Sequence, residues 1–174
     1  RTDVIVHKGL VYPGVSPREY VATAGSETVI DLIAVDWQSQ PVANAEITVE
    51  VVDRRWSSVQ EQDPGGRTTW TYEVEEVPVT SSTVRTDVNG LASFSFVPPN
   101  GGTFKVSATI RDASGNDVRS AAFVWVSSTD YVAWRQQNSN RIDLIANADN
   151  YRVGDTAEIL ITSPFQGTSQ ALIT

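Results

Sequence analysis

The alternation of apolar and polar residues constrains this chain more than any other feature. Between positions 103 and 110, Phe104, Val106, Ala108 and Ile110 are apolar, and the residues between them are threonine, lysine or serine. Successive side chains of a β-strand point to opposite faces, so this segment is predicted to be a strand with one buried face and one solvated face. Such strands belong to antiparallel sheets. Helical periodicity is nearly absent, and the chain is therefore predicted to be all-β.

The same alternation recurs at 47–51 and 92–96, and turn-forming residues separate the strands. Asn89-Gly90 is a strong turn signal because both residue types tolerate positive φ. Further turns are predicted at Gln38–Pro41, Pro98–Gly102 and Asp112–Asn116. Short strands with frequent turns predict an antiparallel β-sandwich.

One segment departs from regular alternation. Trp70, Tyr72 and Val74 occupy alternate positions and share one face, but the next apolar residues are Val77 and Val79, which are out of phase with them by one residue. A β-bulge shifts the phase of a strand by one residue, so a bulge is predicted at Glu75-Glu76. Pro78 lacks a backbone donor and favours an edge strand.

A polar stretch around 127–140 predicts a domain boundary. We expect a sandwich domain at 1–128, a linker at 129–140 and the opening part of a second, truncated sandwich at 141–174. Three strands cannot close a two-sheet core, which is the reason for expecting truncation. These strands are predicted at Ile142–Ala146, Ala157–Thr162 and Ala171–Thr174, with turns at Tyr151–Ala157 and Pro164–Gly167 between them.

Composition narrows the classes of function. The chain has 174 residues, of which 40% are hydrophobic, and a net charge of -8. An acidic chain is a poor partner for nucleic acid or an anionic membrane. There is no cysteine, which excludes disulfides, thiolate metal sites and a cysteine nucleophile within these residues. No apolar run approaches the roughly 20 residues that cross a bilayer, so no membrane insertion is expected. The absence of methionine and of a signal-like start suggests a segment internal to a longer precursor.

Candidate catalytic residues are few. His7 is the only histidine, and no Gly-x-Ser-x-Gly motif accompanies it. Asp31 and Asp36 share a strand of mixed polarity, and three glutamates flank the predicted bulge, at positions 73, 75 and 76. Carboxylate pairs catalyse glycoside hydrolysis only at about 5–10 Å, a spacing that the sequence does not specify. We therefore predict solvated carboxylates, no catalytic, cofactor or metal site, and no enzyme.

Two loops and the tryptophans are further candidate binding features. Asp112–Asp117 weakly resembles a calcium loop but lacks the alternating acidic ligands, and is predicted to be a hairpin turn. The polar stretch 59–67 is the best candidate for a flexible protrusion. Trp37 and Trp125 lie in apolar strands and are expected in the core. The other tryptophans have polar neighbours, and Trp70 with Tyr72 forms either core packing or an exposed aromatic strip; these less certain residues are Trp56, Trp70 and Trp134.

A motif near the end of the chain resembles the bacterial alpha-macroglobulin family. Tyr151–Ala157 reads Tyr-Arg-Val-Gly-Asp-Thr-Ala, and it is followed by Ser-Pro-Phe-Gln-Gly and Ala-Leu-Ile-Thr. In that family a Tyr-x-Pro-Gly-Asp/Glu turn opens macroglobulin-like domains; here Val153 stands where proline is common. Segments 35–45, 86–94 and 102–106 resemble hairpins of the preceding domain.

The resemblance implies a role in protease inhibition by entrapment, in which cleavage of a bait segment collapses a domain array around the protease. The thioester of many members needs a cysteine, so that element would lie outside these residues. The chain would be a scaffold ahead of the bait-bearing region of an exported protein, periplasmic, cell-surface or secreted. Its partners would be neighbouring domains of the same chain and, through the full-length protein, target proteases. Two alternatives stay open: an immunoglobulin-like spacer or adhesin module, and a carbohydrate-binding sandwich.

Overall fold

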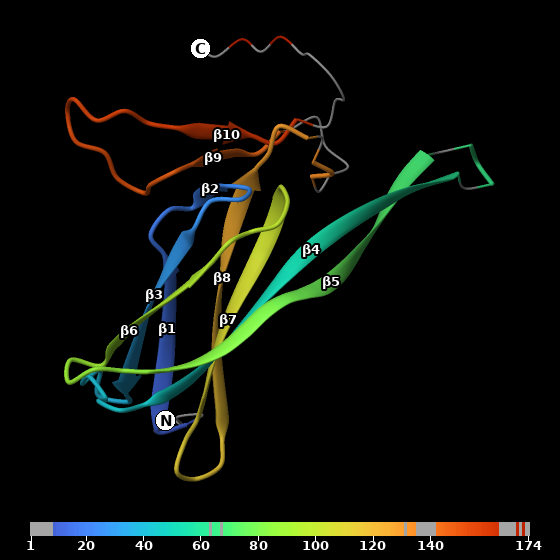
Figure 1. The fold of residues 1–174 in the computed structure, drawn as a ribbon. Helices are drawn as coiled ribbons and strands as arrows, with labels where there is room; N and C mark the ends of the chain where they lie inside the picture. The colour runs from blue at the N-terminus through green and yellow to red at the C-terminus, as the bar shows by residue number, and fades with distance from the viewer. Residues whose placement is uncertain are drawn as a thin grey trace, which may run out of the picture.

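The computed structural model describes residues 9–62, 64–66, 68–130, 132–134, 142–163, 170 and 172, and these residues form strands and no helix (Figure 1). The strands are β1 (Val11–Pro17), β2 (Val21–Thr23), β3 (Thr28–Asp36), β4 (Glu46–Gln62), β5 (Thr68–Arg85), β6 (Leu91–Phe96), β7 (Gly102–Arg111), β8 (Asp117–Ser127), β9 (Leu144–Ala146) and β10 (Ile159–Ile161).

The first eight strands form two packed sheets, which confirms the predicted all-β sandwich. One sheet has the order β1-β3-β6, and the other has the order β2-β8-β7-β4-β5. Neighbours are antiparallel except β2 and β8, which pair in parallel. The chain changes sheets at Arg18–Tyr20, where Arg18 N donates to Val29 O and Tyr20 O accepts from Trp125 N. The continuous segment from β1 to β2 thus contributes one strand to each sheet.

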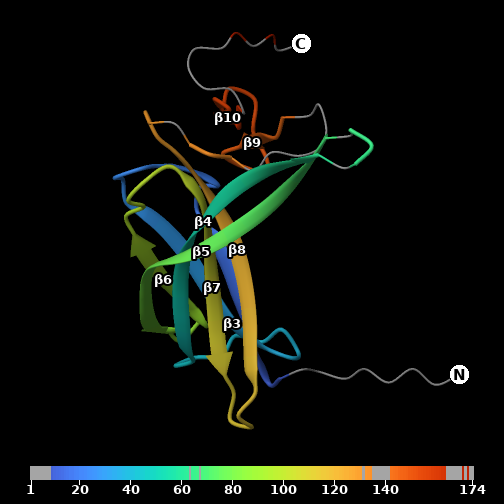
Figure 2. The same ribbon diagram turned by 90° about the vertical axis from the view of Figure 1, so that its right-hand side faces the viewer.

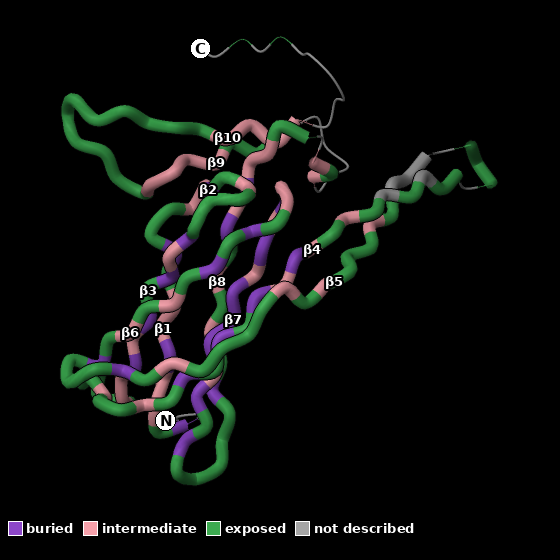
Figure 3. Tube along the Cα trace, viewed as in Figure 1, coloured by how far each residue is buried: buried purple, intermediate pink, exposed green. Residues whose placement is uncertain are grey.

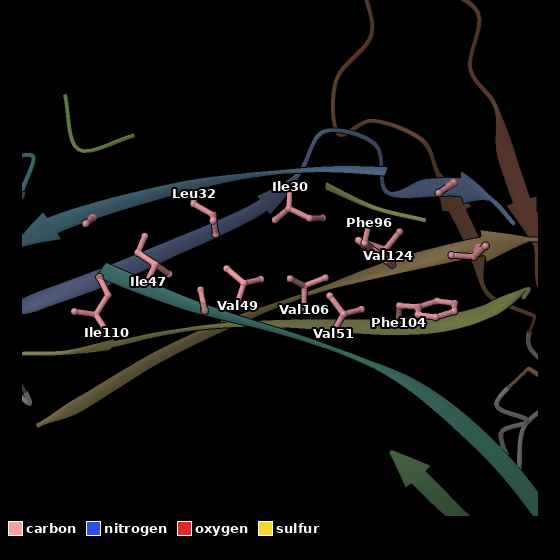
Figure 4. Packing of buried hydrophobic residues seen from close by; sticks show 14 residues of the cluster. Ile30, Leu32, Ile47, Val49, Val51, Phe96, Phe104, Val106, Ile110 and Val124 are labelled. Atoms are coloured by element: carbon pink, nitrogen blue, oxygen red, sulfur yellow. The ribbon is translucent and has the colours of Figure 1, made fainter. Parts of the chain in front are cut away.

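The core lies between the sheets and follows the alternation in the sequence. The four apolar residues of β7 are buried, as predicted, and Phe104 is 0% exposed. Burial of such a side chain contributes about 1.5–3 kcal/mol. The labelled side chains of both sheets point into this space in Figure 4. Buried members of the core include Ile30, Leu32, Ile47, Val49, Val51, Phe96, Val106, Val124 and Val126.

The predicted turns occur, but most of them connect different sheets. Gly90 has φ +74°, and its N–H donates to Asp87 O at 3.1 Å. A side chain at Gly90 would lie 2.7 Å from Ala34 O, so glycine is required for both conformation and space. The expected hairpins at 35–45, 86–94 and 102–106 are wrong, because β3 to β4, β5 to β6 and β6 to β7 all cross between the sheets. Consecutive strands pair directly in β4–β5 and β7–β8.

Strands β4 and β5 extend beyond the sandwich as a two-stranded arm (Figures 1 and 2). β4 pairs with both β5 and β7 from Thr48 to Arg54, and with β5 alone from Arg55 to Gln62. We define the arm as 55–62 together with 68–75. Most of its described residues are exposed (Figure 3). The predicted protrusion at 59–67 is therefore the tip of a long hairpin, in which strand pairing continues to Gln62.

The bulge in β5 lies three residues beyond the predicted site. Pairing is continuous through Glu75 and Glu76, and the register shifts where Val51 pairs with Thr80 and Val52 with Pro78. Val79 is therefore the unpaired residue. The predicted position is wrong because the apolar face of the ribbon changes sides at Glu75-Glu76, where the arm joins the sandwich. Pro78 lies on the edge strand β5, as expected.

Beyond residue 141, β9 and β10 form an antiparallel pair. They are shorter than the strands predicted at 142–146 and 157–162, and the predicted Tyr151 turn closes with Asp155 N donating to Arg152 O at 3.0 Å. Tyr20 donates its hydroxyl to Asp149 Oδ2 at 3.1 Å, which joins this pair to the sandwich and raises the pKa of Tyr20. The turn at 164–167, most of the strand at 171–174 and most of the linker at 129–140 lie outside the described residues. The domain boundaries stay a prediction.

Candidate interaction site at the base of the arm

Two of the candidate catalytic carboxylates, Asp31 and Asp36, take part in local structure. Asp31 Oδ1 accepts a bond from Arg18 at 2.9 Å in an exposed ion pair, which raises the pKa of Arg18. Asp36 Oδ1 accepts from the N–H groups of Gln38 and Gln40 and closes the turn after β3. His7 lies outside the described residues. Within the described part of the chain, no three histidine, cysteine or acidic residues gather as metal ligands.

The loop with a weak likeness to a calcium site is a hairpin turn. Asp112 Oδ1 accepts from the N–H groups of Ser114 and Asn116, both at 2.9 Å. Asp112 Oδ2 accepts from Leu10 N at 2.9 Å, which holds the start of β1 against this turn. The Leu10 and Asn116 donors keep the pKa of Asp112 below its usual range. Its oxygens therefore bind the backbone.

The tryptophans do not fill the core as expected. Trp37 is 53% exposed, so its assignment to the core is wrong. Trp125 is half-buried on the outer face of the five-stranded sheet, because Val124 and Val126 occupy the inward positions of β8. Trp56 and Trp134 are half-buried, and the side chain of Trp70 lies outside the described residues.

The aromatic residues instead surround an arginine at the base of the arm. The Arg54 guanidinium lies 4.9 Å from the Trp56 ring centroid and 5.3 Å from that of Phe123. The ring centroids of Phe123 and Trp125 are 6.4 Å apart, within the range of interacting aromatic pairs. Stacking on aromatic faces stabilises a guanidinium by about 0.5–2 kcal/mol. We call Arg54, Trp56, Lys105, Phe123 and Trp125 the aromatic–arginine face.

Glu76 is the acidic neighbour of both cations of this face. Lys105 Nζ donates to Glu76 Oε1 at 3.1 Å, and Arg54 Nε lies 3.4 Å from the same oxygen. Arg54 Nε is shielded from solvent and has no hydrogen-bond partner among the described residues. Two cations share one carboxylate, so the face has a local excess of positive charge on an acidic chain.

A cleft of about 350 Å³ adjoins the face, between the arm, the β6–β7 loop and the segment that follows β8. Asp53, only 2% exposed, forms part of its wall. Its Oδ2 accepts from Arg55 Nε at 3.0 Å and from Asn100 Nδ2 at 3.2 Å. A side chain at Gly101 would lie 2.4 Å from Val132, so the β6–β7 loop and the segment that follows β8, which we call the exit segment, are in tight contact. The remaining lining residues include Trp56, Ser128, Asp130 and Ala133.

This arrangement offers aromatic, cationic and polar groups for contacts with a partner. The described lining of the cleft combines the Asp53–Arg55 ion pair, the Trp56 indole and the polar residues Ser128 and Asp130. The Arg54 side chain occupies the space between Trp56 and Phe123, where a sugar ring would need to stack. The sequence carried a signal for this face: Phe123 and Trp125 alternate with the inward valines of β8. The sequence did not show that Arg54 joins them, because the pairing of β4 with β7 brings it there.

Two packed sheets joined by crossover turns, with a long edge hairpin, place the chain among the β-sandwich domains. Residues 14–126 match bacterial macroglobulin domain 6, and the chain belongs to this family. It is 24% identical over 146 residues to an alpha-2-macroglobulin homolog from Nostoc, covering 84% of this chain and 8% of that protein. It is 26% identical over 165 residues to an alpha-2-macroglobulin from Ralstonia nicotianae, covering 95% and 9%.

Solved structures share the fold. The native conformation of E. coli alpha-2-macroglobulin matches with a TM-score of 0.58 and 16% identity, over 88% of this chain and 10% of that one. Salmonella alpha-2-macroglobulin reacted with methylamine matches with a TM-score of 0.56 and 15% identity, again over 88% and 10%. The chain thus spans about a tenth of the length of these proteins. In the described residues, no helix is long and apolar enough to cross a membrane.

Proposed function

We propose that this chain is a non-enzymatic scaffold module of an alpha-2-macroglobulin-like inhibitor that traps endopeptidases. The match of residues 14–126 to bacterial macroglobulin domain 6 carries the proposal and favours an inhibitor over a generic spacer module. The site supports it as well, since the carboxylates described above hold turns and ion pairs.

In this role the sandwich is a rigid support and its surfaces bind neighbouring modules of the same polypeptide. The inhibitor would be exported to the periplasm, the cell surface or the medium. Its target proteases would contact the full-length protein, and this module would bind no nucleic acid.

The test measures protease trapping by the full-length polypeptide. A trapped endopeptidase is expected to lose activity on a large protein substrate while it still hydrolyses a small peptide substrate. Deletion of residues 14–126 should abolish this selective loss, and the isolated chain should show neither inhibition nor hydrolysis. Unchanged trapping by the deletion variant, or inhibition by the isolated chain, would contradict the proposal.

A further inference from the structure

We propose that the aromatic–arginine face and the adjoining side of the arm are the docking surface for the following module of the same polypeptide, the one to which β9 and β10 belong. The docking group would be an aliphatic side chain next to a carboxylate. The inference rests on the proposed function, because it takes the chain to be one module among several.

The arm has an apolar side that needs a partner. Cross-strand pairing puts Trp56 opposite Val74, and the next outward position of β5 holds Tyr72. Val74 is 40% exposed and Phe123, on the same side of the sheet, is 37% exposed. An isolated two-stranded hairpin is at best marginally stable in water. A ribbon that leaves the sandwich with its apolar residues on one side is therefore suited to packing against another surface.

The charge of the face selects an acidic partner. Arg54 and Lys105 share Glu76, which leaves one positive charge without a counter-ion in this group. The segment 142–163 has the opposite sign. Its four carboxylates outnumber its one cation, Arg152, and give it a net charge of 1 − 4 = −3; they are Asp143, Asp149, Asp155 and Glu158. Complementary charge favours association and suppresses wrong partners.

The segment that follows β8 leaves the sandwich beside this face. Ser128, Val132 and Ala133, which lead away from β8, line the same cleft as Arg54 and Trp56. The β9–β10 pair and the arm rise from the same end of the sandwich (Figures 1 and 2). This pair has an apolar surface of its own, since Leu144 is 63% and Ile159 51% exposed. The aromatic–arginine face and the β9–β10 pair thus each have exposed apolar residues and carry opposite charge. They are joined by the segment that follows β8.

Site-specific photo-cross-linking in the full-length polypeptide tests the proposal. Benzoylphenylalanine is introduced in place of Phe123, where an aromatic ring is already present. The matched control carries it in place of Arg119, which is exposed on the same strand and the same outward face. Because docked side chains approach within about 4.5 Å, cross-linking at 123 to peptides beyond residue 141 should exceed that at 119 by about tenfold. In the Phe123→benzoylphenylalanine background, Arg54→Met should reduce it about tenfold, equivalent to ~1.4 kcal/mol.

Each other outcome overturns the proposal. A product of twice the mass would assign the face to a second copy, and products with other proteins would assign it to a separate partner. Equal yields at 123 and 119 would show that nothing docks there. The readout is independent of trapping activity: a polypeptide that forms the cross-link without inhibiting any endopeptidase would contradict the proposed function and leave the docking surface intact.

Discussion

Replacement of Asp53 by alanine tests the link between the arm and the β6–β7 loop. The carboxylate is buried and accepts bonds from Asn100 at 3.2 Å and Arg55 at 3.0 Å. A bond to a buried charged group stabilises a fold by about 1.5–3 kcal/mol. The Arg55 side chain is 59% exposed, so its ion pair contributes only about 0–1 kcal/mol. Asp53→Ala should therefore lower the free energy of unfolding by about 2–3 kcal/mol.

Urea titration followed by tryptophan fluorescence measures this change, and a double-mutant cycle isolates its source. Asn100→Ala alone should cost about 1–2 kcal/mol, and the two substitutions together should cost less than their sum by about 1 kcal/mol, because they remove the same bond. Arg55→Ala is the matched control and should cost under about 1 kcal/mol. Strict additivity of Asp53→Ala and Asn100→Ala, or a loss at Asp53 no larger than at Arg55, would refute this reasoning.

Three further changes test the core, the exit segment and the turns. Phe104→Ala should lower the free energy of unfolding by about 3–5 kcal/mol in the same titration, and a loss below 1.5 kcal/mol would contradict its place in the core. Gly101→Val should raise amide hydrogen exchange around Val132, where the new side chain overlaps, and leave exchange in β7 unchanged; protection equal to wild type would contradict the tight contact. Backbone donors lower the folded-state pKa of Asp87 and Asp112, so their stabilisation is complete at neutral pH and is lost as pH falls below the ordinary range near 3.9 through the lowered folded value. Replacing both by asparagine should flatten the acid limb of stability against pH, and an unchanged slope would contradict this origin.

The alternation of apolar and polar residues predicts most of the fold, because a strand with one buried face has an apolar residue at every second position. β7 shows this best, since its four apolar residues are all inward. The prediction that Trp37 lies in the core is wrong because β3 carries apolar residues on both of its faces, so alternation does not show which face is buried. The fully buried residues are the even-numbered Ile30, Leu32 and Ala34, and the odd-numbered series that ends at Trp37 faces outward.

Other features depend on contacts between distant parts of the chain. Turn residues such as Asn89-Gly90 specify a reversal of direction but not which sheet the next strand joins, so they do not predict the crossovers. The phase change near Glu76 was visible, but it marks a switch of the apolar face rather than a bulge. The position of Arg54 between two aromatic rings requires the register of β4, β7 and β8 together.

A single-particle structure of the full-length polypeptide, before and after reaction with an endopeptidase, tests the central claim most directly. The account predicts that residues 9–127 superpose as one rigid sandwich in both states, with Phe123 and Arg54 covered by the module that follows β8 in the unreacted state. A sandwich that comes apart on reaction, or an aromatic–arginine face open to solvent before it, would contradict the account.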